Sequence, residues 1–191
     1  NDKDTQALPC CHYGFQIVMR PLSDLERVLM IDPNYEKKKS TLSFGQARLL
    51  FENLKISNVP KYGFELHWDQ RSVDTFLGLP YNIASYATLA LILEKITGHK
   101  ALAIQGDLKK VHLYDNSLDA VKEQLSRDVN KYDKCEFIIG TTNGTYNNLK
   151  LFKENGLQLN TLINNLHIDD FKLVNYESYP HIKVEMLERD E

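Results

Sequence analysis

Apolar and polar positions alternate along residues 64–70, where Phe64, Leu66 and Trp68 fall on one face and polar or charged side chains on the other. This period of two predicts a strand with one buried and one solvated side. Residues 83–96 are instead apolar on nearly every side, which predicts a buried helix that ends at Gly98 as its C-cap. The same patterns predict further strands at residues 12–19, 101–104, 135–139 and 171–174, and further helices at residues 43–54 and 118–127.

This mixture of strands and helices predicts an α/β (α+β) fold with a single domain over residues 1–191. A chain of 191 residues with 42% hydrophobic content is large enough for one core. Two stretches interrupt the pattern, residues 20–62 and the polar residues 134–165, and we expect both to be insertions. The lysines at 37–39 fit a solvated loop better than a nucleic-acid surface, because the net charge is −3.

The composition also limits the cellular setting and the partners. The chain has no apolar run of about 18 residues and begins with polar and acidic residues, so we expect a cytoplasmic protein with no membrane or nucleic-acid partner. Three cysteines, two of them adjacent, fit a reducing compartment better than a disulfide framework. Cys10, Cys11 and His12 stand too close together to wrap a metal ion, so no metal site is expected.

The richest candidate site lies at residues 71–86, where a cation, two hydroxyls, a carboxylate and an amide gather at a strand-to-helix junction. Such a junction is suited to a polar anion, since Arg71 offers two parallel donors and the Ser72 hydroxyl a third. Together with residues 7–12 and 111–114, it points to a nucleotide enzyme with a cysteine nucleophile.

These segments resemble the thymidylate synthase family. Residues 70–86 resemble its phosphate-binding strand, turn and central helix, and residues 8–13 resemble its nucleophile loop. Later segments follow in the family's order, at residues 124–127, 169–171, 176, 180, 182 and 183. The likeness covers most of the chain outside the two insertions, and the ordered set is far more specific than any one motif. It implies a mixed β-sheet packed against a long buried central helix.

By this resemblance Cys11 is the nucleophile that adds to C6 of the pyrimidine of dUMP. The addition needs a thiolate, because C6 is a soft acceptor, and we expect Arg71 to lower the pKa of the thiol. The alternative is that Cys11 is simply a small core residue. Cys10 stands where the family commonly has proline, and we interpret it as structural.

The resemblance also implies how dUMP is bound. Arg71 and Ser72 would hold the phosphate, Asn82 would read the uracil, and His112 with Tyr114 would hold the 3′-hydroxyl. A carboxamide can donate to O4 and accept from N3–H, which fits uracil better than cytosine. The simpler interpretations are a helix N-cap for Asn82 and strand surface for the histidine and tyrosine. The implied dUMP-binding residues are Gln70, Arg71, Ser72, Val73, Asp74, Asn82, His112, Leu113 and Tyr114.

The family's co-substrate is 5,10-methylenetetrahydrofolate, and the resemblance assigns three residues to it. Asp74 would bond the donor-rich pterin ring, Gly78 would let the turn approach the ligand closely, and Leu187 belongs to a tail that covers the folate. The implied activity is the reductive methylation of dUMP to dTMP, which yields dihydrofolate, in a homodimer. Hydroxymethylation of dUMP on the same fold, and a non-catalytic fragment that binds a nucleotide or a partner, are the alternatives.

Two departures from the family pattern affect these expectations. The Gly106–Asp107 pair is too far from His112 for the family's usual spacing, and Lys110 stands where its acid would be. The family's acid/base residue, active-site tryptophan, first phosphate arginine and partner-donated arginine pair all precede the nucleophile loop. Only ten residues precede Cys11 here. We therefore expect the C-terminal portion of such an enzyme, completed by an N-terminal segment or a partner chain.

Overall fold

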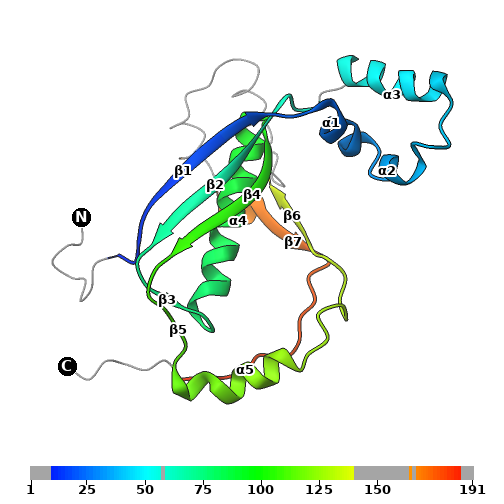
Figure 1. Ribbon diagram of the computed structural model, residues 1–191. Coiled ribbons are helices and arrows are strands. Elements are labelled where there is room, and N and C mark those ends of the chain that lie inside the picture. Colours follow the sequence, from blue (N-terminus) through cyan, green and yellow to red (C-terminus); the bar gives the residue numbers. More distant parts are fainter. Residues whose placement is uncertain (1–9, 57–58, 140–163, 165–166, 186–191) are drawn as a thin grey trace.

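A three-stranded sheet is the framework on which the candidate site is built. The computed structural model describes residues 10–56, 59–139, 164 and 167–185. Strand β2 (Tyr62–Gln70) lies in the centre, antiparallel to β1 (His12–Pro21) and parallel to β4 (Lys100–Leu108). Helix α4 (Gly78–Thr97) connects β2 to β4 and packs on one face of the sheet (Figure 1). The predicted strands at 12–19, 64–70 and 101–104 are confirmed, each with a somewhat longer extent.

The core between this sheet and α4 follows from the alternation along β2. Phe64, Leu66 and Trp68 are almost completely buried and pack with Ala90 of α4. The Trp68 ring stacks on Tyr86 of α4, with ring centroids 4.8 Å apart. The burial of these side chains is the main force that holds the helix against the sheet.

Helix α4 begins earlier than its sequence pattern predicts, at Gly78, and ends as predicted at Gly98. Gly98 has a φ of 72°, a left-handed conformation that glycine adopts without strain, and its N–H donates to the Glu94 carbonyl. The expectation of burial on every side is wrong for the described residues. Within residues 83–96, Ile83 is 43% exposed and Ala84 and Ser85 are exposed as well, because the sheet covers only one side of the helix.

The segment between β1 and β2 is a small helical unit that projects from one end of the sheet (Figure 1). It contains α1 (Asp24–Ile31), α2 (Tyr35–Lys38) and α3 (Phe44–Ile56). Helix α3 was expected from the sequence, whereas α1 and α2 were not. The lysines at 37–39 are exposed as expected, but Lys37 and Lys38 belong to α2 rather than to a loop. They make local ion pairs, such as Lys38 Nζ to Asp32 at 2.6 Å.

Shorter elements complete the described chain. Strands β3 (Val73–Asp74) and β5 (Val111–His112) form a parallel pair, and β6 (Glu136–Ile139) and β7 (Phe171–Val174) form an antiparallel pair. Helix α5 (Leu118–Leu125) follows the short 3-10 helix η1 (Asp115–Ser117), and η2 (Ile168–Asp170) precedes β7. These elements confirm the predictions at 118–127, 135–139 and 171–174. Among the described helices, none is both long and apolar enough to cross a membrane.

Candidate functional site

Cys11 and Arg71 meet where β1 begins and β2 ends. The antiparallel pairing of these strands brings the two residues together although 60 positions separate them. The Arg71 backbone N–H donates to the Cys11 carbonyl at 2.7 Å, and Arg71 Nη2 lies 3.6 Å from Cys11 Sγ. A guanidinium at this distance interacts favourably with a thiolate. The geometry therefore joins the predicted nucleophile to the predicted cation.

The next part of the site is a buried amide network beneath the turn into α4. Gln70 is 3% exposed and its Nε2 donates to Asn82 Oδ1 at 2.9 Å and to the Ser72 carbonyl at 3.1 Å. Trp68 Nε1 donates in turn to Gln70 Oε1 at 3.3 Å. The network fixes the Asn82 carboxamide with its oxygen toward Gln70. The side-chain nitrogen of Asn82, Nδ2, is then the atom that can donate a hydrogen bond to a ligand.

Asn82 is not the N-cap of α4, so that interpretation of the sequence is wrong. The helix already begins at Gly78, which places Asn82 inside its second turn. The carboxylate of Asp74 accepts from the backbone N–H groups of Phe76 at 3.0 Å and Leu77 at 3.4 Å, just before the helix. Both bonds use Oδ1. Asp74 therefore holds the turn at the start of α4, in addition to any role in binding.

The β3–β5 pair sets Asp74 beside His112 in the strand register. The His112 Nδ1 lies 2.9 Å from the Lys110 carbonyl, which favours the tautomer with a proton on Nδ1 and leaves Nε2 as an acceptor. The rings of His112 and Tyr114 meet edge to face, with centroids 5.0 Å apart. Although Tyr114 lies beyond the end of β5, the two side chains are neighbours, as predicted.

The altered loop before His112 has a structural role. Lys110 adopts a φ of 43°, a left-handed conformation that is uncommon for a residue with a side chain. Its carbonyl accepts from the Val73 N–H at 3.3 Å and also faces His112 Nδ1. The Lys109 N–H donates to the Gln70 carbonyl at 2.9 Å. These bonds attach the loop to the turn at residues 70–73, so the residues before and after the loop lie at the same end of the sheet.

The remaining predicted residues differ in what they can offer. Val73 is fully buried, so only its backbone is available to a ligand, whereas Leu113 is 38% exposed. Gly78 lies between Asp74 and Asn82, since a Cβ on Gly78 would be 3.5 Å from the Asp74 Cβ and 3.8 Å from Asn82 Oδ1. Leu187 lies outside the described residues.

Two contacts next to the candidate site were not predicted from the sequence. His12 Nδ1 and the Tyr86 hydroxyl are hydrogen-bonded at 3.1 Å, and burial, with a smaller contribution from Asp69, raises the pKa of Tyr86. Lys109 Nζ donates to the Tyr13 hydroxyl at 2.6 Å and pairs with Asp107 at 3.2 Å. The Tyr13 bond, followed by Asp107, raises the pKa of Lys109. Neither contact has a signal in the sequence pattern.

Two further observations concern cavities and metals. A cavity of about 380 Å³ lies between the C-terminal part of α4 and β6, lined by Leu91, Lys95 and Phe137 among others, and none of the predicted site residues contributes to it. The described part of the chain contains no group of three or more metal-ligating side chains placed to hold an ion.

Comparison with known proteins gives a consistent result. The family model described as thymidylate synthase matches residues 1–188. Thymidylate synthase of Enterobacteria phage T4 is 41% identical over 133 residues, which are 68% of this chain and 43% of that protein. A probable thymidylate synthase of Escherichia phage T5 is 35% identical over 124 residues, which are 65% of this chain and 30% of that protein. The chain thus spans less than half the length of these curated relatives.

Solved structures confirm the predicted fold class. The crystal structure of thymidylate synthase from T4 phage matches with a TM-score of 0.51 and 38% sequence identity, covering 64% of this chain and 41% of that one. Thermostable thymidylate synthase A from Bacillus subtilis matches with a TM-score of 0.50 and 24% identity, covering 65% of this chain and 38% of that one. At that lower identity the similarity concerns the fold alone.

Proposed function

Because the chain belongs to the thymidylate synthase family, we propose that the protein is a thymidylate synthase, a methyltransferase of nucleotide biosynthesis. The proposed reaction is the reductive methylation of dUMP to dTMP with 5,10-methylenetetrahydrofolate, which leaves as dihydrofolate. The observation that most directly supports this proposal is the 3.6 Å approach of Arg71 Nη2 to Cys11 Sγ.

In the proposed mechanism the Cys11 thiolate adds to C6 of the uracil ring, and the electron pair of the C5–C6 double bond moves toward C5 and O4. C5 then bonds to the methylene carbon of the folate. Loss of the C5 proton and elimination of tetrahydrofolate leave an exocyclic methylene, which accepts a hydride from the tetrahydrofolate as Cys11 departs from C6. Arg71 faces the sulfur that carries negative charge before the addition and after the release.

The amide network supports a role for Asn82 in reading the base. Gln70 donates to Asn82 Oδ1 and so orients the carboxamide, leaving Nδ2 as a donor for O4 of uracil. The Asn82 oxygen has a second lone pair with which to accept from N3–H. Arg71 and Ser72, at the adjacent turn, are the proposed phosphate ligands.

The β3–β5 pair supports the remaining ligand roles. His112 has Nε2 to accept from the 3′-hydroxyl, because its Nδ1 faces the Lys110 carbonyl, and Tyr114 lies against the same ring. Asp74 uses Oδ1 for the turn before α4, which leaves Oδ2 for donors of the pterin ring. Gly78 lies next to this carboxylate and is part of the same proposed folate site.

Covalent trapping tests the proposal. With 5-fluoro-dUMP and 5,10-methylenetetrahydrofolate, we expect the complete protein to form an adduct at Cys11 that intact mass spectrometry detects. The Cys11→Ser variant should lose the adduct, whereas Cys135→Ser, which changes an exposed cysteine outside the site, should keep it. If the complete, folded protein gives no adduct, the enzyme proposal fails and a non-catalytic binding role takes its place.

Trapping does not separate methylation from hydroxymethylation, because both begin with the same addition. The hydroxymethylase alternative is not favoured by the comparisons described above. The mass of the product distinguishes the two reactions, and the absorbance change on dihydrofolate formation accompanies only methylation.

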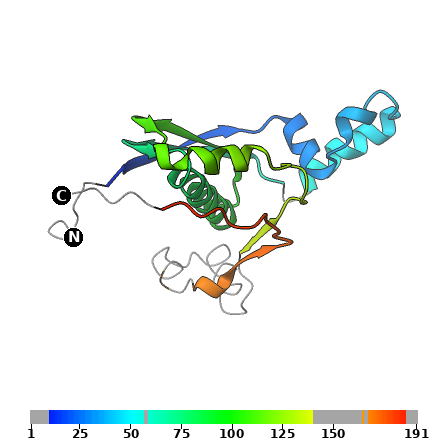
Figure 2. The same ribbon diagram turned by 90° about the horizontal axis from the view of Figure 1, so that it is seen from below.

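We also propose that the protein works as a homodimer. On the sheet face opposite α4, no element of the described chain covers β1, β2 and β4 (Figures 1 and 2). Sheets bury at least one face and frequently pack against a second sheet at about 10 Å. A second copy of the chain, packed sheet to sheet, would cover this open face.

A further inference from the structure

Two adjacent thiols lie at the start of β1, and only one of them has a role in the proposed reaction. Cys10 is exposed, Cys11 is partly exposed, and Arg71 Nη2 lies 3.6 Å from Cys11 Sγ. A partly exposed cysteine beside a cation is the setting in which a thiol is reactive toward oxidants as well as toward substrates. Because Cys10 is covalently next to Cys11, its sulfur is within reach of any oxidised form of Cys11.

We propose that Cys10 is the resolving thiol of a peroxide-sensitive pair, so that oxidation converts Cys10 and Cys11 reversibly into a vicinal disulfide that switches off the nucleophile. The proposal rests on the proposed function in so far as Cys11 is taken to be the nucleophile. The oxidation itself requires only the reactivity of the thiol and its neighbour.

The chemistry takes place in two steps. The Cys11 thiolate attacks one oxygen of hydrogen peroxide, which gives the sulfenic acid at Cys11 and releases hydroxide. The Cys10 sulfur then attacks the sulfenic sulfur, the S–O bond breaks, and the oxygen leaves as water with the Cys10 proton. In total, two thiols lose two electrons and one peroxide becomes two waters. A dithiol reductant reverses the reaction by exchange.

The adjacency of the two cysteines determines the properties of the disulfide. A disulfide between neighbouring residues closes a small ring that departs from relaxed disulfide geometry, and strained disulfides are the more easily reduced ones. The pair therefore favours a reversible state over a permanent structural bond. By consuming the sulfenic acid, Cys10 also protects Cys11 from the irreversible sulfinic and sulfonic acids.

The third cysteine is badly placed to compete. Cys135 directly precedes β6, which lies with Lys95 and Gly98 around the cavity at the C-terminal end of α4. His12, next to Cys11, contacts Tyr86 in the N-terminal half of that helix. From Tyr86 to Gly98 the helix rises roughly 18 Å. Cys135 therefore serves as a matched control.

Peroxide oxidation of the whole chain, followed by trypsin digestion and mass spectrometry, tests the pair. Trypsin leaves Cys10 and Cys11 in one peptide and Cys135 in another, since Lys134 separates them. We expect the first peptide of the wild type and of Cys135→Ser to become about 2 Da lighter, and dithiothreitol to restore it. In Cys10→Ser we expect Cys11 to gain roughly 32 or 48 Da instead, as the sulfinic or sulfonic acid. The oxidised fraction of Cys11 with these masses should be at least about tenfold larger than in the wild type, and dithiothreitol should not reverse it.

Trapping with 5-fluoro-dUMP provides a second readout. Oxidised wild-type protein should form no adduct until it is reduced, whereas oxidised Cys10→Ser should stay unreactive after reduction. The proposal is overturned if Cys10→Ser recovers its Cys11 thiol as completely as the wild type, or if Cys11 pairs with Cys135. If no form of the protein is trapped but the 2 Da change occurs, the proposed function fails while the thiol pair stands.

Discussion

At the scale of single residues, Gly106 of β4 is a position where the core has no room for a side chain. A Cβ at this position would lie against the Trp68 ring, 2.7 Å from its Cε2 atom. The ring cannot move away easily, because it is 4% exposed and stacked on Tyr86. We expect Gly106→Ala to lower the free energy of unfolding by about 1–3 kcal/mol, measured by urea denaturation.

Gly45→Ala is the matched control for Gly106→Ala. Gly45 is the second residue of α3, and a Cβ built on it would have no described atom within 4 Å apart from its adjacent residues and the nearby helix backbone. Because alanine favours helix, this variant should be as stable as the wild type or more stable by up to about 1 kcal/mol. Equal losses of stability in both variants would refute the proposed steric cause.

Asn82→Asp should change the choice of base without disturbing the fold. The aspartate carboxylate keeps an oxygen that can accept from Gln70 Nε2. In the wild type, Gln70 Nε2 lies 2.9 Å from Asn82 Oδ1. It cannot donate to O4 of uracil, but it can accept from the 4-amino group of cytosine. We expect the ratio of affinities for dUMP over dCMP to fall at least about tenfold, measured by equilibrium binding to the complete protein. An unchanged ratio would remove Asn82 from base recognition.

The grouping of the candidate site residues was predictable from motif order, but their local contacts were not. Order along the chain brought Cys11 and Arg71 into one hypothesis, and strand pairing places them together. The bond between Gln70 and Asn82 and the left-handed Lys110 depend on three-dimensional packing. The N-cap interpretation of Asn82 was wrong because the helix begins five residues earlier than the apolar pattern suggests.

At the scale of elements, strands were easier to predict than short helices. The alternation along β2 and the apolar run of α4 are long enough to define a period, and both elements were predicted. Helices α1 and α2 have only 8 and 4 residues and lie close to Pro21 and Pro33, and proline is a residue that interrupts helical patterns. The exposure of Ile83 was not predictable, since an apolar pattern does not say which neighbours cover a helix.

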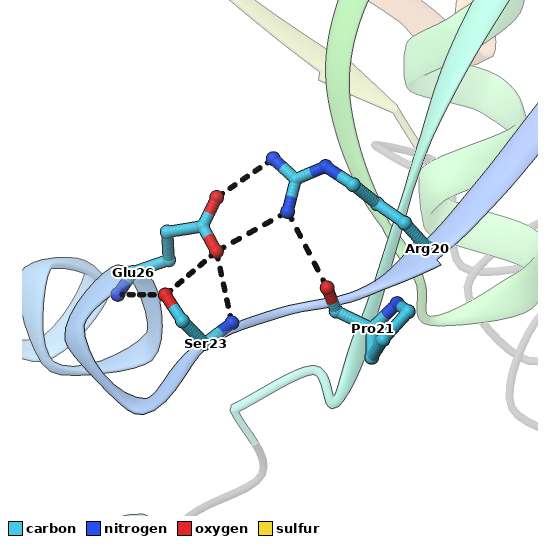
Figure 3. A network of polar contacts seen from close by, with 4 residues as sticks. All are labelled: Arg20, Pro21, Ser23 and Glu26. Atoms are coloured by element: carbon cyan, nitrogen blue, oxygen red, sulfur yellow. Dashed lines mark hydrogen bonds and ion pairs between the residues drawn. The ribbon is translucent and has the colours of Figure 1, made fainter.

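The capping network between β1 and α1 gives an element-level prediction (Figure 3). Ser23 is the N-cap, its hydroxyl accepts from the Glu26 N–H, and the Glu26 carboxylate accepts from the Ser23 N–H at 2.8 Å. Ser23→Ala removes half of this capping box and should destabilise the protein by about 1 kcal/mol in urea denaturation. The exposed Ser178, outside any helix, is the control position, and Ser178→Ala should change stability by less than about 0.5 kcal/mol.

The same network predicts a dependence on pH. The bond to Arg20, followed by the bonds to Ser23, lowers the pKa of Glu26 from 4.5 to about 2. A carboxyl whose pKa is lowered by folding stabilises the fold fully above its unfolded value and loses that contribution as the pH falls through the folded value. The stability difference between wild type and Glu26→Gln should therefore be constant above about pH 5 and shrink toward pH 2. A difference that does not change over this range would exclude the carboxylate as its source.

At the scale of the whole molecule, the sheet has two unlike faces. One carries Phe64, Leu66 and Trp68 under α4. The strand register assigns to the other face, in order along β1, β2 and β4, the residues Gln16, Val18, Glu65, His67, Asp69, Ala103, Gln105 and Asp107. This second face has apolar positions at Val18 and Ala103 among polar ones, a mixture found in protein interfaces as well as on free surfaces.

Val18→Arg tests whether this face joins two copies of the chain. Val18 is 43% exposed and pairs across the strands with Glu65, so an arginine there gains a cross-strand carboxylate and the folded monomer tolerates it. In a sheet-to-sheet dimer the same arginine would carry its charge into the buried interface, and we expect the dimer dissociation constant to rise at least about tenfold in sedimentation equilibrium. Val129→Arg makes the same change at a residue that is 90% exposed and outside the sheet, and it should leave the dissociation constant unchanged. A monomeric wild type, or a Val18→Arg variant that dimerises normally, would exclude the open sheet face as the dimer interface.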